Sequence, residues 1–233
     1  RLRREGRLPL AAFGDFSAQA LVAPLHDLLA RYREQLEHWS QVEDEQRELS
    51  HVHAGIELAD WLGGLRRNAD GQLASLQLVS GKLHEGKGYK WHGLVRPWVR
   101  HLALQLCGEP VTSVLVGLTG TLEFPPLPAQ DARAELDALM QAWFEGMSRP
   151  LPVACKAAFA WLAAGDDEER AAREAAKRYD GGFNLSGEAS SSAALARVYP
   201  DFAALAASGE FGAWAEALYG PLFSIMQRKE QDA

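Results

Sequence analysis

Cysteine is scarce in this chain of 233 residues, which contains two, Cys107 and Cys155. Two isolated cysteines make neither a disulfide framework nor a cysteine-based zinc motif, and they are typical of a reducing compartment. No apolar run reaches membrane-spanning length, and no secretory signal opens the chain. Positive charge is also limited, because 24 Lys and Arg face 31 Asp and Glu, giving a net charge of -7. This balance excludes a surface covered in nucleic-acid-binding charge and leaves room for a local basic strip.

The rest of the composition is ordinary for a globular protein, with 47% hydrophobic and 24% charged residues. The first half alternates helical and strand periodicities, whereas from Gln130 onward apolar residues recur at helical spacing. Ser17 has the residue type of a helix N-cap, so we expect a helix to begin there. The further elements expected before Gln130 are strands at about 47–52, 56–66 and 72–79, a helix ending near Leu106, and a buried strand at 111–118.

These patterns predict an α/β (α+β) protein with two parts. We expect residues 1–128 to form a core with an N-terminal helix, and residues 129–233 to form a C-terminal helical region packed on that core. The chain opens on Arg1 rather than on Met, and we therefore expect it to be part of a longer protein.

The order of the expected elements, helix, three strands, helix and strand (αβββαβ), resembles a PD-(D/E)XK nuclease core. The most informative segment is the expected hairpin at 61–81, which corresponds to the metal-binding hairpin of such a core. Such nucleases place an acid late in the first strand of this hairpin and acid-x-Lys late in the second. In this chain those positions hold Arg66, Gln77 and Val79. A cation, an amide and an alkyl group cannot bind magnesium. We therefore expect a nuclease-like core that is catalytically inactive, without catalytic or metal-binding residues.

The alternative is a metal-dependent DNA exonuclease that uses Glu57, Asp60 and Asp70. Such an enzyme needs at least two carboxylates on one cation. Glu57 and Asp60 are an odd number of positions apart, so on a strand they face opposite sides. Asp70 is explained by the turn in which it lies. We therefore favour the inactive core, although this sequence alone leaves the enzyme open.

Two further motifs are incomplete. His51 and His53 share one face of an expected strand, but no Cys or His follows at ligand spacing, so a structural zinc site is not expected. Gly81–Lys87 matches the first part of a phosphate-binding loop. Gly88 then stands where the magnesium-binding Ser or Thr belongs, and no helix is expected there. We expect no cofactor in this fragment.

A basic strip with aromatic residues follows the hairpin. Cations pair with phosphates, and flat rings stack on unpaired bases, so this strip could contact DNA or part a duplex. The alternative is that the lysines only keep a loop hydrated. The residues we single out as DNA contacts are Arg66, Arg67, Lys82, Lys87, Tyr89, Lys90 and Trp91.

Six phrases follow one another along nearly the whole chain, at 6–14, 98–102, 123–127, 145–151, 179–182 and 218–222. In their order and spacing they resemble the C-terminal domain of the gamma subunit (RecC) of bacterial exodeoxyribonuclease V.

The resemblance implies a subunit of a cytoplasmic bacterial helicase–nuclease that processes double-strand breaks. It implies a nuclease-like domain that does not cut, and that helps to split the duplex and guide its strands. Magnesium and ATP would be used by RecB-like and RecD-like partner subunits, which we expect to dock on the C-terminal helices. DNA would be contacted in the assembled complex. A protein-docking module without DNA contact is the remaining alternative.

Overall fold

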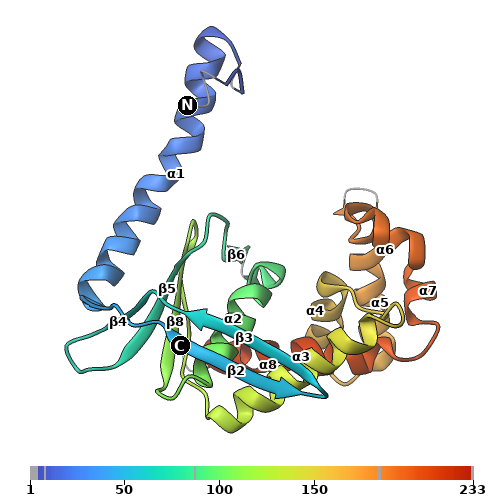
Figure 1. The fold of residues 1–233 in the computed structure, drawn as a ribbon. Helices are drawn as coiled ribbons and strands as arrows, with labels where there is room; N and C mark the ends of the chain where they lie inside the picture. Colours follow the sequence, from blue (N-terminus) through green and yellow to red (C-terminus); the bar gives the residue numbers. More distant parts are fainter. Residues whose placement is uncertain (1–4, 8, 87, 183–184, 232–233) are drawn as a thin grey trace. The chain divides into compact units, whose positions relative to one another are not determined.

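The computed structural model describes residues 5–7, 9–86, 88–182 and 185–231 (Figure 1). The mixed α+β class is confirmed. The chain forms two compact units, which differ in their boundaries from the expected 1–128 and 129–233, because 47–62 and 94–109 group with the C-terminal helices. The first unit comprises residues 1–46, 63–93 and 110–126, and the second comprises 47–62, 94–109 and 127–233.

Helix α1 (Ala11–His38) begins earlier than expected, because Ser17 lies inside it and the extended residue Leu10 precedes it. The prediction of Ser17 as the N-cap is wrong, since no residue between Ala11 and Ser17 breaks the helix. The C-terminal half of α1 packs on the sheet of the first unit through Leu28 and Tyr32. Its N-terminal half extends away from that sheet (Figure 1) and exposes many apolar side chains, among them Phe13, Phe16, Leu21 and Val22.

The first unit is built on a five-stranded sheet in the order β1-β4-β5-β8-β9. Only the β5–β8 pair is parallel, while the other three neighbouring pairs are antiparallel. Between β5 and β8 the chain passes through helix α2 (Val95–Gln105). The three strands of this sheet that precede α2 differ from the three expected, because 47–52 and most of 56–66 lie outside the sheet. The strands are β1 (Gln41–Glu43), β4 (Leu65–Arg67), β5 (Leu73–Leu78), β8 (Val111–Gly117) and β9 (Gly120–Phe124).

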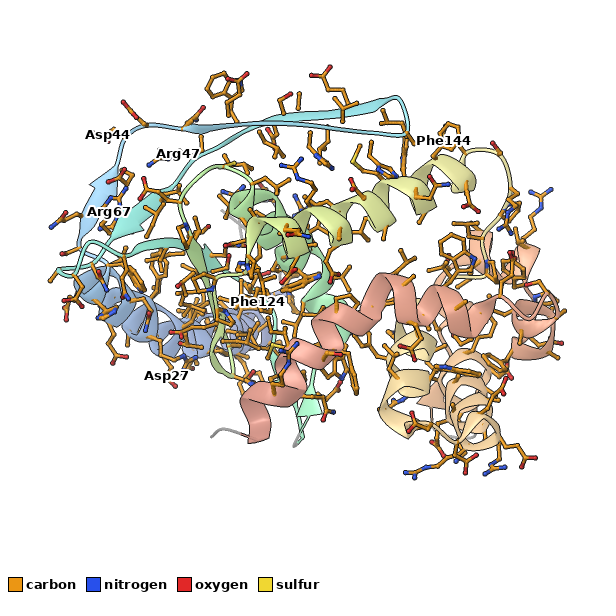
Figure 2. The ribbon with its side chains drawn as sticks, turned by 90° about the horizontal axis from the view of Figure 1, so that it is seen from below. Asp27, Asp44, Arg47, Arg67, Phe124 and Phe144 are labelled. Carbon is orange, nitrogen blue, oxygen red and sulfur yellow. The ribbon has the colours of Figure 1, made fainter. Side chains whose placement is uncertain are left out.

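The strand expected at 56–66 is two strands, which is a correction. Gly63 and Gly64 interrupt it, and Gly64 has a φ of 74°, a conformation that glycine adopts without strain. The first half, β3 (Ile56–Leu62), pairs with β2 (Arg47–His53) in a separate two-stranded sheet. Figure 2 shows Arg47 at the start of this hairpin. The first strand of the five-stranded sheet is therefore Gln41–Glu43 and not 47–52, because β1 pairs directly with β4.

The second unit is mainly helical, as expected from Gln130 onward. Buried alanines let the helices α4 and α5 approach closely, and larger side chains such as Phe202, Phe211 and Tyr179 fill the space around them. None of the described helices is both long and apolar enough to cross a bilayer. Besides α2, the α-helices described in this unit are α3 (Ala129–Gly146), α4 (Cys155–Ala164), α5 (Glu168–Asp180), α6 (Ala193–Val198), α7 (Phe202–Ala206) and α8 (Phe211–Gln231).

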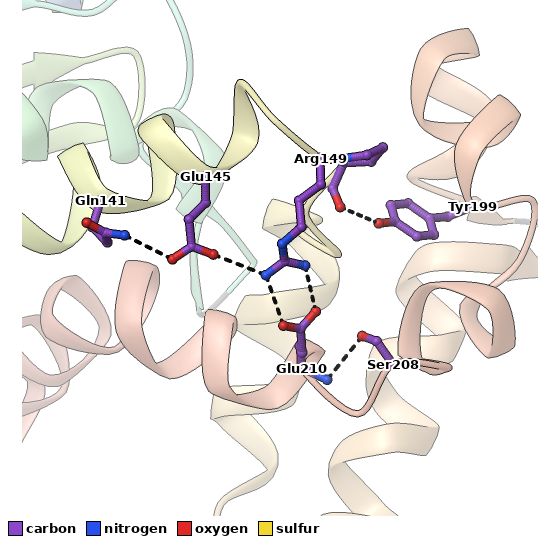
Figure 3. Close-up of polar contacts among 7 residues, drawn as sticks. Gln141, Glu145, Arg149, Tyr199, Ser208 and Glu210 are labelled. Atoms are coloured by element: carbon purple, nitrogen blue, oxygen red, sulfur yellow. Dashed lines mark hydrogen bonds and ion pairs between the residues drawn. The ribbon is translucent and has the colours of Figure 1, made fainter.

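Arg149 joins the end of α3 to the beginning of α8 (Figure 3). Its guanidinium donates to Glu210 Oε2 at 2.8 Å and to Glu145 Oε2 at 3.1 Å. The hydrogen bond from Arg149 lowers the pKa of Glu210. Because these groups are exposed, the ion pairs contribute little to stability and mainly orient the segment that follows α3.

Glu135 on α3 is expected to make stability depend on pH. Partial burial and the neighbouring Asp131 carboxylate raise the pKa of Glu135 from 4.5 to about 7. The folded state therefore holds this proton more tightly than the unfolded chain, and its stability falls as pH rises from 4.5 to 7. Glu135→Gln is expected to remove about 1 kcal/mol of this fall, after allowance for solvent screening of a half-exposed group.

Urea unfolding at pH 5 and at pH 8 measures this effect. The matched control is Glu216→Gln, which replaces an exposed carboxylate in the same unit. Equal pH dependence in the wild type and in Glu135→Gln would contradict the prediction.

Candidate nucleic-acid interface

The hairpin β4–β5 is closed by a turn that Asn68 organises. The buried Asn68 side chain accepts hydrogen bonds from the backbone N–H of Asp70 at 3.1 Å and of Gln72 at 2.9 Å. Gly71 completes the turn with a φ of 77°. Asp70 thus lies in a turn that its neighbours hold, which is the position expected for it from the sequence.

The three positions expected to correspond to a nuclease site do not share one face of the sheet. Arg66 pairs with Ala74, which packs beneath α1, so Arg66 lies on the α1 face. Gln77 is an odd number of positions from Ala74, and it therefore lies on the opposite face with Val79. Gln77 Nε2 is buried and has no hydrogen-bond partner among the residues that the structure describes. The structure brings Gln77 and Val79 to one face and places Arg66 on the other.

Both arginines of β4 are engaged within the first unit. Arg66 donates to the backbone carbonyls of Trp39 and Ser40, the latter at 3.0 Å. Arg67 donates to Glu43 Oε1 at 2.8 Å and to the Gly71 carbonyl at 2.9 Å. These contacts hold β1 and the turn against β4, so both guanidinium groups have a structural use.

The segment 81–93 is fixed to the turn between β8 and β9. Thr119 Oγ1 accepts hydrogen bonds from the N–H of Leu83 at 2.9 Å and of His84 at 3.0 Å. The Gly81 carbonyl accepts from the Leu118 N–H at 3.0 Å. Sequence reasoning did not find Thr119, because a lone Thr in a turn carries no signal of a partner so far along the chain.

A row of rings lies on this segment. His84 and Tyr89 face each other across the short hairpin of β6 (His84–Glu85) and β7 (Gly88–Tyr89), with ring centroids 5.1 Å apart. Trp91 follows, edge-on to Tyr89 at 5.2 Å. All three rings are partly exposed. Such rings can stack on unpaired bases.

Lysines flank the row of rings. Lys82 is exposed and Lys90 is half-buried. The Lys90 backbone N–H donates to the Leu83 carbonyl at 2.8 Å, which fixes the chain at that point. Lys87, also expected to contact DNA, lies outside the described residues. Lys82 and Lys90 thus belong to the same short segment as the three rings, a combination of residue types that suits a nucleic-acid strand.

Loss of the Thr119 acceptor is expected to loosen the segment 81–93. Thr119→Val keeps the shape but removes the oxygen that accepts from Leu83 and His84, and we expect a loss of about 1 kcal/mol in the free energy of unfolding. Amide hydrogen exchange at these two residues should become faster. Thr119→Ser keeps the oxygen and serves as the control, so equal effects of both substitutions would contradict the prediction.

The acidic residues of the alternative nuclease site are distributed over both units. Glu57 and Asp60 are exposed on β3 in the second unit, while Asp70 lies in the first. Among the described residues, no three His, Cys, Asp or Glu side chains are grouped so that they could hold a metal ion. Gly88 begins β7 rather than a helix, which does not match a phosphate-binding loop.

Comparison with known proteins identifies the family of this chain. No curated protein matches the chain. The family model described as the RecC C-terminal domain matches residues 1–166. This match covers more than half of the chain and includes the sheet, the β2–β3 hairpin and the segment with the row of rings. The chain therefore belongs to the RecC C-terminal domain family.

Proposed function

We propose that this chain is a non-cutting, nuclease-like scaffold that separates and guides DNA strands in a helicase–nuclease complex. Membership of the RecC family indicates part of a RecBCD-type complex in DNA repair. The observation that supports the role in separating and guiding DNA strands is the row of rings formed by His84, Tyr89 and Trp91. These rings lie on a segment that also contains lysines and is anchored to the sheet. RecB-like and RecD-like partner subunits would supply the motors, the nuclease, and the magnesium and ATP they use.

The nuclease-like part of the proposal rests on connectivity. Within the five-stranded sheet, the antiparallel strands β1, β4 and β5 follow α1, and β8, which is parallel to β5, follows α2. This order supports a likeness to the αβββαβ core of the PD-(D/E)XK fold. Gln77 and Val79 occupy the positions where such an enzyme carries its acid and its lysine, and neither side chain is a ligand for a hard cation.

Strand separation would be mechanical. A motor subunit pulls the DNA, and Tyr89 and Trp91 offer faces on which newly unpaired bases stack, at about 1–3 kcal/mol per base. Lys82 and Lys90 lower the repulsion between the separated phosphates. Arg66 and Arg67 would contribute mainly by keeping the hairpin β4–β5 rigid. Lys87 is proposed as a further phosphate contact.

The test is unwinding of forked DNA by the assembled complex that carries substitutions in this domain. The double variant Tyr89→Ala/Trp91→Ala is expected to lower the unwinding rate several-fold while ATP hydrolysis on single-stranded DNA stays unchanged. Lys82→Ala/Lys90→Ala is expected to make binding to the fork less dependent on salt, with a slope lower by about 1–2. The control is Phe13→Ala, an exposed aromatic residue of α1 in the first unit.

Unchanged unwinding in the ring variant, with an unchanged salt slope in the lysine variant, would favour a docking module without DNA contact. A second assay addresses cutting. Linear DNA incubated with the purified chain and magnesium or manganese is expected to remain intact. Cutting that Asp60→Ala abolishes would favour the exonuclease.

A further inference from the structure

The β2–β3 hairpin has two unlike faces. Its closing turn contains Ala54 and Gly55, both with positive φ, as in the tight turns that favour the twist of a hairpin. One face carries Leu49, His51 and Leu62, which are buried. We call the other the outer face; its residues are all exposed. They form the cross-strand pairs Glu48 with Trp61, Ser50 with Ala59, and Val52 with Glu57.

A polar cluster holds the inner face on α3, alongside which the hairpin runs (Figures 1 and 2). The buried His51 contacts Asp137 Oδ1 through Nε2 at 2.6 Å, and Arg133 Nη1 contacts His51 Nδ1 at 3.2 Å. Since arginine only donates, His51 Nδ1 accepts and Nε2–H donates to Asp137. His53 Nδ1 reaches the same carboxylate oxygen at 3.2 Å. The side chains of this cluster thus serve to hold the hairpin on α3.

The hairpin is an excursion that the five-stranded sheet does not need. Residues Glu43 of β1 and Leu65 of β4 are paired neighbours, and the hairpin lies between them in sequence. An isolated two-stranded sheet is only marginally stable in water. Because a buried polar cluster holds this one in place, we expect the hairpin to have a function of its own. Insertions of this kind commonly carry binding residues.

The outer face combines apolar anchors with negative charge. Trp61 is 60% exposed and Val52 is 62% exposed. Tryptophan is among the residues most enriched in binding hot spots. Each apolar residue stands opposite a glutamate, Trp61 opposite Glu48 and Val52 opposite Glu57, and the face carries no Lys or Arg. Carboxylates at both ends of the face repel phosphates, so this surface does not suit nucleic acid. It suits a protein segment that presents Lys or Arg beside apolar side chains.

We propose that the outer face of the β2–β3 hairpin is a docking surface for a basic amphipathic segment of a partner protein. Apolar side chains of that segment cover Trp61 and Val52, and its Lys or Arg residues pair with Glu48 and Glu57. The segment lies on the face rather than along the edge of β3, because Asp60 Oδ1 already accepts the Trp61 N–H at 2.8 Å. This site goes beyond strand separation and does not depend on DNA contact.

The probe is a synthetic amphipathic helical peptide of Leu, Ala and Lys, with a counterpart in which Glu replaces Lys. Fluorescence anisotropy of the labelled peptide with the full chain is expected to show saturable binding of the Lys peptide alone. Trp61→Ser and Glu57→Lys should each weaken binding at least tenfold. The matched controls are Val198→Ser, an exposed apolar residue, and Glu216→Lys, which makes the same change in charge elsewhere.

Each other outcome overturns the proposal. Equal weakening by Glu216→Lys would mean attraction to net charge alone, and equal binding of the Glu peptide would remove charge complementarity. A dimer in sedimentation that Trp61→Ser abolishes would make a second copy the occupant. Displacement of the peptide by forked DNA would identify a nucleic-acid surface. Thermal unfolding followed by circular dichroism verifies that the variants, all at exposed positions, remain folded.

Discussion

Gly117→Ala is expected to lower the free energy of unfolding by about 2–3 kcal/mol and to displace the segment that carries Tyr89 and Trp91. A Cβ at Gly117 would lie 2.5 Å from Leu83 Cγ and 3.0 Å from the Gly81 carbonyl oxygen. Leu83 is buried, so its branch point cannot swing aside without moving the backbone. Overpacking of this kind costs about 1–3 kcal/mol. Urea unfolding measures the loss in stability.

A double-mutant cycle with Leu83→Ala isolates the clash. The double variant is expected to cost clearly less than the sum of the two single variants, because the smaller side chain frees the space that the new Cβ needs. Gly93→Ala serves as the control, since a Cβ at Gly93 would meet no described atom within 4 Å. Additive effects of Gly117→Ala and Leu83→Ala would show that the contact is not the cause.

The second large effect is expected from Asp137→Ala, at about 2–3 kcal/mol. The His51 side chain is buried, and removal of the carboxylate leaves its Nε2–H without an acceptor. His53 loses its contact with the same oxygen. The hairpin β2–β3 should then open more often, so hydrogen exchange should accelerate in residues 47–62 more than in α4 or α5.

Two further variants test whether the cost comes from the unpaired imidazole. His51→Leu/Asp137→Leu replaces both partners with apolar groups and is expected to cost much less than Asp137→Ala alone. Asp166→Ala, at an exposed position of the same unit, should be nearly neutral. Equal losses in the single and the double variant would assign the effect to packing rather than to hydrogen bonding.

Periodicity sufficed for most helices and for the central strands. The mostly apolar segment 111–118 predicts a buried strand, and β8 lies there in the sheet. The excursion was not predictable in the same way. Strand β1 is only Gln41–Glu43, too short for a periodic signal, and the more regular strand 47–52 was therefore placed in the sheet.

The candidate site was predicted in part. The aromatic and basic residues of 81–93 are visible in the sequence because they lie close together in it, whereas their anchor Thr119 comes from a distant turn. The expected grouping of Arg66 with Gln77 needs the pairing register, and a register that sets Arg66 against Ala74 separates them. The partners of His51 and His53 on α3 are likewise tertiary and leave no local pattern.

The root of the hairpin determines how the sheet would respond to mechanical load. The β2–β3 hairpin follows β1 in the chain and precedes β4. A pulling force on the hairpin would therefore act first on the residue pair Glu43 and Leu65, which joins β1 to β4. Strand β1 lies at the margin of the sheet and would peel first. The Arg67–Glu43 ion pair and the bonds from Arg66 to Trp39 and Ser40 fasten that margin. Arg66 and Arg67 would then resist the separation of β1 from β4 under force, a role that does not require contact with DNA.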